Sequence, residues 1–413
     1  MIVSKNLLIH TFRRPDDGAF IRVKNLNTAI AEITAGHCHE VVLVSVRHFR
    51  EIFKNDRNTR IFERRLILPI LWTNRHLLAR TWNGFSSCIA GLILATFLRP
   101  DIVVGETSAS WKLAKATKFW RQRAKLIMDL HGAGPEEVLF HNPTSKLHES
   151  VYSYESRLEQ EIALNADFIT CQSVNMIEHL IIKYPATRAR FHPFQCSVRS
   201  ELFRMDLDTR SYYRQKLQLN DGETLFVYCG SVHKWQNVHY SVNVFAEYLK
   251  CSATAAKLLI MCPNPDAELC NHAYSLGLSD DDFRIIAVPH EEVPAYLNAA
   301  DIGFLIRDDG VVNRVASPTK LGEYLACGLS VIVGNVANSW SSARLDSSCF
   351  CFVDLDNAAG AANTILRFVD SKSDDPMSVK QSATSLAGLS LSTTTETERL
   401  KMFMKHSVME QIS

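Results

Sequence analysis

The feature that most constrains the fold is an alternation of short apolar runs with helical segments, which passes along the chain twice. Strand-like runs lie at residues 6–11, 40–46, 101–105, 126–130 and 168–171, and again at 224–228, 257–261, 284–288, 303–306 and 330–333. Near-continuous apolar strands that alternate with helices are typical of parallel sheets covered on both faces. We therefore predict an α/β fold of two Rossmann-like domains whose sheets face a central cleft, with ligands beyond the carboxyl ends of the strands.

The bulk properties agree with a two-domain globular protein. A chain of 413 residues exceeds what one hydrophobic core usually serves. The pattern loosens around residues 191–222, so we predict domains at 1–205 and 206–390 and a C-terminal helical segment, 391–413, that packs back on the body. The Ser/Thr/Asp-rich stretch 371–395 predicts a surface linker with some short helix, and the uncharged run 84–98 predicts a buried helix too short to span a bilayer.

Charge and cysteine content narrow the function classes. A net charge of +1 gives no whole-protein field that favours nucleic acid. The eleven cysteines show no metal-ligand spacing and read as reduced thiols of a cytosolic protein. The N-terminus, MIVSKNLLIH, lacks the apolar core of a signal peptide. We expect a cytoplasmic location, with the inner membrane face as an alternative.

The stretch SPTKLGEYLACGLSVI, residues 317–332, carries the most chemistry. Ser317 suits a helix N-cap and Pro318 the first helical position, while Gly328 suits a left-handed residue after a helix of about ten residues. The amino end of such a helix binds anions, above all phosphate. Lys320 adds a cation, and Thr319 and Glu323 share one face. The alternative is a solvated polar face of an ordinary helix.

This stretch closely resembles the donor-site signature of family-4 retaining glycosyltransferases, which have the GT-B fold. The resemblance implies that Glu323 binds the ribose of a nucleotide-diphosphate sugar and that neighbouring amides hold the diphosphate. Many members carry a further glutamate eight residues earlier, where this chain has Val315. Arg307, Asp308 and Asp309 are the candidates to take over its role with the sugar.

The loop after strand 224–228 reads YCGSVHKWQ and resembles the first strand-loop of the family's C-terminal domain. Gly230 and Ser231 form a tight turn that brings backbone amides close to a ligand. The resemblance implies that a basic residue here contacts the donor diphosphate, with Lys234 as the candidate and Arg314 as a second cation. A glycine-serine turn with a surface lysine is the alternative.

Three residues of the first domain follow strand ends or precede a helix. His131 resembles the family's first-domain histidine, which implies a catalytic role in positioning and polarisation; a purely structural histidine is the alternative. Gly18 and Glu106 are the predicted acceptor-side residues. Glu136 and Glu137 suit either the acceptor or a helix amino end, and we favour the helix end for one of them.

Basic and apolar residues interleave between Arg47 and Arg80. This pattern suits an anionic membrane surface or a lipid-diphosphate acceptor, and equally a solvated helix face. Arg307-Asp308-Asp309 is not a D-x-D metal motif, so we expect no catalytic metal and no cofactor besides the nucleotide-sugar substrate.

The sequence therefore favours a retaining glycosyltransferase that moves a sugar from a nucleotide-diphosphate donor to a saccharide or lipid-linked acceptor in surface polysaccharide or glycoconjugate biosynthesis. A sugar-nucleotide epimerase of the same fold and a non-catalytic sugar-nucleotide-binding relative stay open. A dinucleotide oxidoreductase is disfavoured because no G-x-G-x-x-G follows the first strand.

Overall fold

The computed structural model describes residues 5–11, 18–33, 38–45, 64–70, 77–141, 146–265, 267–339, 348–372 and 375–408. The chain forms two compact units. Unit 1 comprises Met1–Gln195 and Glu396–Ser413, and unit 2 comprises Cys196–Thr395. The change of unit falls at Gln195/Cys196, whereas the sequence placed a boundary at 205/206.

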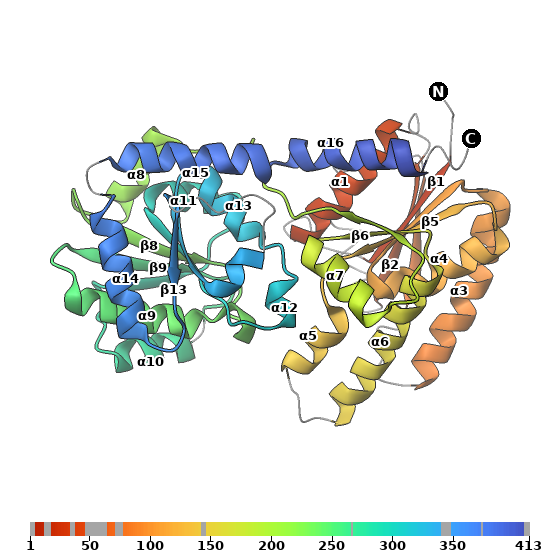
Figure 1. Cartoon of the computed structure of the whole chain (residues 1–413), viewed down its shortest axis with the longest axis horizontal. Coiled ribbons are helices and arrows are strands. Elements are labelled where there is room, and N and C mark those ends of the chain that lie inside the picture. Colours follow the sequence, from red (N-terminus) through yellow and green to blue (C-terminus); the bar gives the residue numbers. More distant parts are fainter. Residues whose placement is uncertain are drawn as a thin grey trace. The chain divides into compact units, whose positions relative to one another are not determined.

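The described residues of unit 1 contain a seven-stranded sheet in which every pairing is parallel (Figure 1). Its strand order is β3-β2-β1-β4-β5-β6-β7, so the order reverses between β1 and β4. The elements are β1 Asn6–Thr11, α1 Gly18–Ile33, β2 Cys38–Ser45, β3 Arg64–Ile70, α3 Leu77–Phe97, β4 Ile102–Glu106, α4 Thr107–Trp120, β5 Lys125–Leu130, α5 Gly134–His141, α6 Lys146–Asn165, β6 Phe168–Cys171, α7 Val174–Lys183 and β7 Arg190–Pro193.

The C-terminal end of the chain helps to build the core of unit 1. Helix α16 (Thr393–Phe403) starts in the last residues of unit 2 and continues into unit 1, followed by η4 (Met404–Val408). Leu400 and Met404 are fully buried in one cluster with α1 and with strand residues such as Leu8 and Ile127. The apolar face of α16 therefore belongs to this core.

Helix α3 corrects one prediction. Gly91 lies so close to the backbone of α4 at Thr117 that no Cβ fits there, and Leu94 and Ala95 are buried. The other face of α3 exposes large apolar side chains, and Phe97 is 81% exposed. The prediction of a buried helix is wrong for this face, because low charge does not reveal which side of a helix has a partner.

The described residues of unit 2 contain a six-stranded parallel sheet of order β10-β9-β8-β11-β12-β13. This doubly wound order reverses between β8 and β11. The elements are α8 Leu207–Lys216, β8 Thr224–Cys229, η2 Lys234–Gln236, α9 Val238–Cys251, β9 Ala256–Met261, α10 Ala267–Ser275, β10 Phe283–Ile286, α11 Val293–Ala299, β11 Ile302–Leu305, α12 Val311–Arg314, α13 Thr319–Ala326, β12 Ser330–Gly334, η3 Asn335–Ser339, β13 Phe350–Val353, α14 Ala358–Asp370 and α15 Pro376–Ser390.

Alternate residues of these strands enter two separate cores, as strand geometry requires. Leu225 and Val227 of β8 pack with α11, α13 and α15, whereas Phe226 and Tyr228 pack with α9, α10 and α14. Figure 1 shows these two groups of helices on opposite faces of the sheet. The predicted α/β architecture is confirmed in each unit.

Helix α15 is longer and more deeply buried than the predicted surface linker with some short helix. Asp375 caps it by accepting a hydrogen bond from Ser378 N, and Pro376 follows at the first helical position. Ala383 and Ala387 are buried against the sheet. Ser/Thr-rich composition concealed a helix whose small apolar residues recur every four positions.

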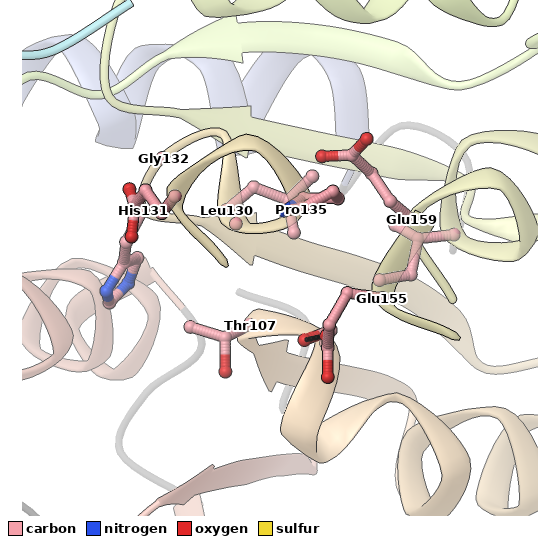
Figure 2. Close-up of a pocket in the computed structure, with 11 residues that line it drawn as sticks. Thr107, Leu130, His131, Gly132, Pro135, Glu155 and Glu159 are labelled. Atoms are coloured by element: carbon pink, nitrogen blue, oxygen red, sulfur yellow. Dashed lines mark hydrogen bonds between the residues drawn. The ribbon is translucent and has the colours of Figure 1, made fainter. Parts of the chain in front are cut away.

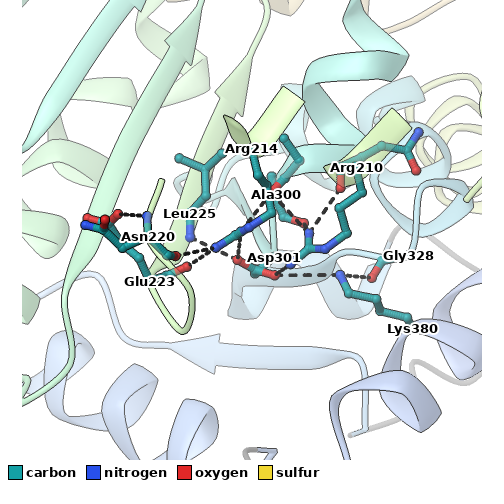
Figure 3. Close-up of polar contacts among 11 residues, drawn as sticks. Arg210, Arg214, Asn220, Glu223, Leu225, Ala300, Asp301, Gly328 and Lys380 are labelled. Carbon is teal, nitrogen blue, oxygen red and sulfur yellow. Dashed lines mark hydrogen bonds and ion pairs between the residues drawn. The ribbon is translucent and has the colours of Figure 1, made fainter. Parts of the chain in front are cut away.

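A cationic cluster at the amino ends of the strands joins α8 and α15 to the sheet (Figure 3). Asp301 lies 2.6 Å from Arg210, 3.2 Å from Arg214 and 3.8 Å from Lys380. Its carboxylate also accepts a hydrogen bond from Leu225 N. Burial opposes ionisation, but these cations hold the pKa of Asp301 below its ordinary value. Asp301 therefore serves the fold.

Candidate donor and acceptor sites

The amino end of α13 forms at the predicted place by a different cap. Pro318 occupies the cap position with no side-chain cap, and the helix runs for eight residues from Thr319. The prediction that Ser317 caps this helix is wrong, because its Oγ accepts a hydrogen bond from Cys196 N at 3.0 Å. Gly328 has a φ of 81°, which confirms the predicted left-handed position after the helix.

Lys320 is the centre of a polar cluster at the carboxyl end of β8. Its ammonium donates to the Tyr228 hydroxyl and to Gln236 Oε1, each at 2.9 Å. The same ammonium lies 4.5 Å from the centroid of the Tyr228 ring. Gly230 has a φ of 130°, and a Cβ built there would lie 2.4 Å from Lys320 Cε. The predicted glycine turn therefore makes room for the lysine chain.

Arg307 adds a second cation where β11 ends. The side chain is buried, and its Nη2 donates to Gln236 Oε1 at 3.2 Å, so two cations share one amide oxygen. Burial, together with the nearby Arg307 cation, lowers the pKa of Lys320 to about 7. Burial likewise lowers the pKa of Arg307 to about 10. Close cations at the point where the strand order reverses give a site suited to a polyanion such as a diphosphate.

Glu323 lies one turn further along α13. Burial raises its pKa to about 7, against the opposing effects of Lys320 and Arg199. The next residue, Tyr324, is fully buried, and its hydroxyl oxygen accepts a hydrogen bond from Cys229 N at 2.8 Å. The tyrosine thus ties α13 to the end of β8. Glu323 and Thr319, by contrast, keep partly exposed side chains.

The other donor-site candidates are more exposed. Lys234 lies at the solvent-exposed start of η2. Arg314 is bound to Asp309 through contacts of 2.6 and 2.7 Å, and Asp308 accepts a hydrogen bond from Asn237 Nδ2 at 2.7 Å. Ser231 is partly exposed, and its carbonyl oxygen accepts the hydrogen bond of the Tyr228 hydroxyl.

Val315 fills the position of the missing glutamate with a buried side chain that is 3% exposed. Of the candidates to replace that glutamate, Arg307 alone joins the Lys320 cluster among the contacts of the described residues. The cluster is therefore more cationic than the sequence suggested.

In unit 1, His131 lies between two carboxylates at the end of β5. Its Nε2 is 2.8 Å from Asp129 Oδ2, and its Nδ1 is 3.5 Å from Glu106 Oε1. Glu106 is almost fully buried and accepts hydrogen bonds from the backbone and hydroxyl of Thr11, at 3.1 and 3.2 Å. Predicted catalytic and acceptor-side residues thus meet where the strand order of this sheet reverses.

Asp129 holds the His131 ring through its contact with Nε2. It is fully buried and accepts hydrogen bonds from Arg22 Nε at 3.0 Å and from Thr170 Oγ1 at 2.6 Å, besides its contact with His131. Burial opposes ionisation, yet Arg22 and His131 hold the pKa of Asp129 well below its ordinary value. An ionised Asp129 keeps one nitrogen of the His131 ring in a fixed orientation.

The remaining predicted residues lie in different surroundings. Gly18 is the first residue of α1, and the loop before it lies outside the described residues. Glu136 and Glu137 both lie in the first turn of α5. Glu136 is paired with Lys183 at 2.7 Å, whereas Glu137 lines a pocket beside His131. The basic segment from Arg47 lies largely outside the described residues.

Sequence reasoning missed Tyr228, Gln236 and the Arg22–Asp129 pair. Tyr228 and Gln236 stood in the quoted loop, but nothing in their spacing showed that their side chains turn toward Lys320, 92 and 84 residues away. Arg22 and Asp129 are 107 residues apart. A buried aspartate two residues before a strand-end histidine is the one local signal available.

Comparison with solved structures identifies the fold class of this chain. HepE from Anabaena, solved with UDP and glucose, is 13% identical with a TM-score of 0.70, over 97% of this chain and 99% of that chain. Sucrose-phosphate synthase from Thermosynechococcus elongatus is 16% identical, with a TM-score of 0.68 over 97% and 98%. WaaG, a glycosyltransferase involved in lipopolysaccharide biosynthesis, is 14% identical, with a TM-score of 0.68 over 96% and 98%. The chain therefore has the GT-B fold.

The family follows from the sequence of unit 2. Residues 209–385 match the family model described as Glycosyl transferases group 1. This match covers most of unit 2 and includes the whole of α13. Among curated proteins, no sequence matches the chain significantly. Unit 2 therefore carries a glycosyl transferases group 1 domain, which agrees with the predicted glycosyltransferase class.

Proposed function

We propose that this chain is a retaining glycosyltransferase that takes a sugar from a nucleotide-diphosphate donor bound in unit 2. The acceptor is a saccharide or lipid-linked saccharide, and the setting is surface polysaccharide or glycoconjugate biosynthesis. The observation that carries the proposal is the pair of cations, Lys320 and Arg307, gathered on Gln236 beside the amino end of α13. HepE, which has the same fold, was solved with UDP and glucose, so a UDP-sugar is the first donor to test.

The proposed chemistry assigns the cations to the leaving group. As the bond between sugar and diphosphate breaks, negative charge grows on the phosphate, and preorganised cations and helix amides stabilise it. Glu323 accepts the hydrogen bonds of the ribose hydroxyls from one turn further along α13. His131 positions the transferred sugar, and its orientation is set by Asp129. We propose that no metal takes part, because these cations supply the positive charge.

The test is the release of nucleoside diphosphate from UDP-glucose and other nucleotide sugars, with and without a mixture of saccharide acceptors. The anomeric configuration of the product is read by proton NMR. The proposal requires release that grows with acceptor and a product with the donor's anomeric configuration. Inversion would refute the retaining mechanism, and turnover to a new sugar nucleotide without acceptor would instead identify an epimerase. Glu323→Ala should abolish release, and Glu247→Ala, which removes a carboxylate of α9 paired with Lys250, is the matched control.

Peripheral membrane contact is a second part of the proposal. No helix among the described residues has the length and apolarity to cross a bilayer. The exposed apolar side chains of α3 supply a surface that an interfacial contact would bury: Trp82, Phe85, Ile89, Ile93 and Phe97. Co-sedimentation with vesicles of anionic lipid should fall for Phe85→Asp, with the exposed Phe119→Asp of α4 as comparison. Equal sedimentation of wild type and the Phe85 variant would contradict this contact.

A further inference from the structure

A pocket of about 280 Å³ lies beside His131, and all its lining residues belong to unit 1. The amino ends of α4 and α5 and the middle of α6 form its walls (Figure 2). Thr107, at the start of α4, has a φ of 56°, which is strained for a β-branched residue. Such strain concentrates at functional sites. The pocket has space for a monosaccharide unit.

The lining of this pocket is acidic, with Glu137, Glu155 and Glu159 contributing carboxylates. Two of them have protein donors. Glu155 accepts a hydrogen bond from Ser108 Oγ at 2.6 Å, and Glu159 accepts one from Lys183 Nζ at 2.7 Å. Within the described part of the chain, the Glu137 carboxylate makes no such side-chain contact, and burial raises its pKa.

The cations near the pocket are already engaged. His131 is the basic residue of the lining, and its Nε2 is held by Asp129. Lys183 lies 2.7 Å from both Glu136 and Glu159. The amino ends of α4 and α5 contribute only partial positive charges, whereas Glu137, Glu155 and Glu159 contribute three carboxylates. The described surroundings therefore leave a negative potential in the pocket, and the Glu137 carboxylate is open to a hydroxyl or ammonium donor and unfavourable for a phosphate.

We propose that this pocket binds a sugar ring of the acceptor and selects a ring without phosphate or carboxylate, docked by a hydroxyl or ammonium donor to Glu137. This inference rests on the proposed function and names its acceptor class. It favours a neutral or amino sugar at the reacting end over a sugar phosphate. A lipid diphosphate would then lie outside this pocket.

The experiment compares binding of methyl glucoside, glucosamine and glucose 6-phosphate by saturation-transfer NMR titration. The protein carries Lys320→Met, so that phosphate binding at the proposed donor cluster does not contribute. We expect glucosamine to bind most tightly and glucose 6-phosphate about tenfold more weakly than methyl glucoside, from charge repulsion across a partly solvated pocket. Glu137→Gln should remove the preference for the amine, and Glu136→Gln, whose carboxylate is paired with Lys183, should keep it.

Equal or tighter binding of glucose 6-phosphate would overturn the inference, as would absence of binding by all three sugars or an unchanged order in Glu137→Gln. Glu137→Asp, which keeps the charge, provides a second variant if the glutamine variant does not fold. Nucleoside diphosphate binding to the wild-type protein reports separately on unit 2. A failed sugar titration with intact nucleotide binding therefore refutes this inference and leaves the proposed function standing.

Discussion

Replacement of Lys320 by methionine should raise stability while it weakens donor binding. The pKa of Lys320 falls from the ordinary 10.5 to about 7 on folding, because burial removes water from the ammonium group and so destabilises its charged form. At neutral pH this difference corresponds to roughly 4 kcal/mol of lost stability. Because the folded pKa is depressed, the penalty is largest below pH 7 and disappears above the ordinary pKa of the lysine.

Methionine removes this penalty and gives up the two hydrogen bonds to Tyr228 and Gln236, worth roughly 1 kcal/mol each. About 2 kcal/mol of net stabilisation remains, which corresponds to several degrees in melting temperature. Donor affinity should fall about 10- to 100-fold, because a charge-assisted hydrogen bond to phosphate is lost.

Thermal denaturation followed by calorimetric titration with UDP measures both effects on one preparation. Lys234→Met is the matched control, since that lysine is exposed and should change stability by no more than about 0.5 kcal/mol. A Lys320→Met variant that melts below wild type, or that binds UDP with unchanged affinity, would contradict this prediction.

Three further predictions concern the pH dependence of nucleotide binding, the role of Asp301 and the buried position of Val315. Nucleotide affinity should peak near pH 7, because binding needs a protonated Lys320, which deprotonates above its pKa of about 7, and an ionised Glu323, which is protonated below its pKa of about 7. Calorimetric titration at a series of pH values measures this profile, and a monotonic profile would contradict the prediction. Asp301→Ala should cost about 2 to 3 kcal/mol, measured by urea unfolding, because Lys380, Arg210 and Arg214 lose their carboxylate partner while the arginines keep backbone carbonyl acceptors. Because the pKa of Asp301 is depressed in the folded protein, the wild-type advantage is present above the ordinary value of 3.8 and is lost as the pH falls through the folded pKa. Val315→Glu should lower the melting temperature without improving donor affinity, because this position is buried; unchanged stability with tighter binding would show that the missing glutamate can be restored.

Strands were the most predictable elements of this fold. The predicted runs 6–11 and 168–171 coincide with β1 and β6, because strands buried on both faces read as continuous apolar stretches. Helices with small or polar residues were harder. Asp375 as a cap and Pro376 at the first helical position predict the start of α15, but we gave more weight to the Ser/Thr-rich composition of the segment.

The donor site was predictable only in part. The motif from Ser317 placed α13 and its anion-binding end in the right position, since proline and Gly328 act locally. The hydrogen bonds from Lys320 to Tyr228 and Gln236 join residues that are far apart in the chain, so the spacing of residues in the sequence does not predict them. The same holds for Asp129 beneath His131, whose arginine partner comes from a distant helix.

Unit 2 should bind a nucleoside diphosphate through α13. The most direct test is the thermal shift of the wild-type protein with UDP, GDP, ADP and CMP, repeated for Glu323→Ala. A ligand at about a hundred times its dissociation constant adds roughly 2.7 kcal/mol to the native state. We predict that one nucleoside diphosphate stabilises the wild type and that Glu323→Ala loses the effect. No shift with any nucleotide, or an equal shift in the variant, would contradict it.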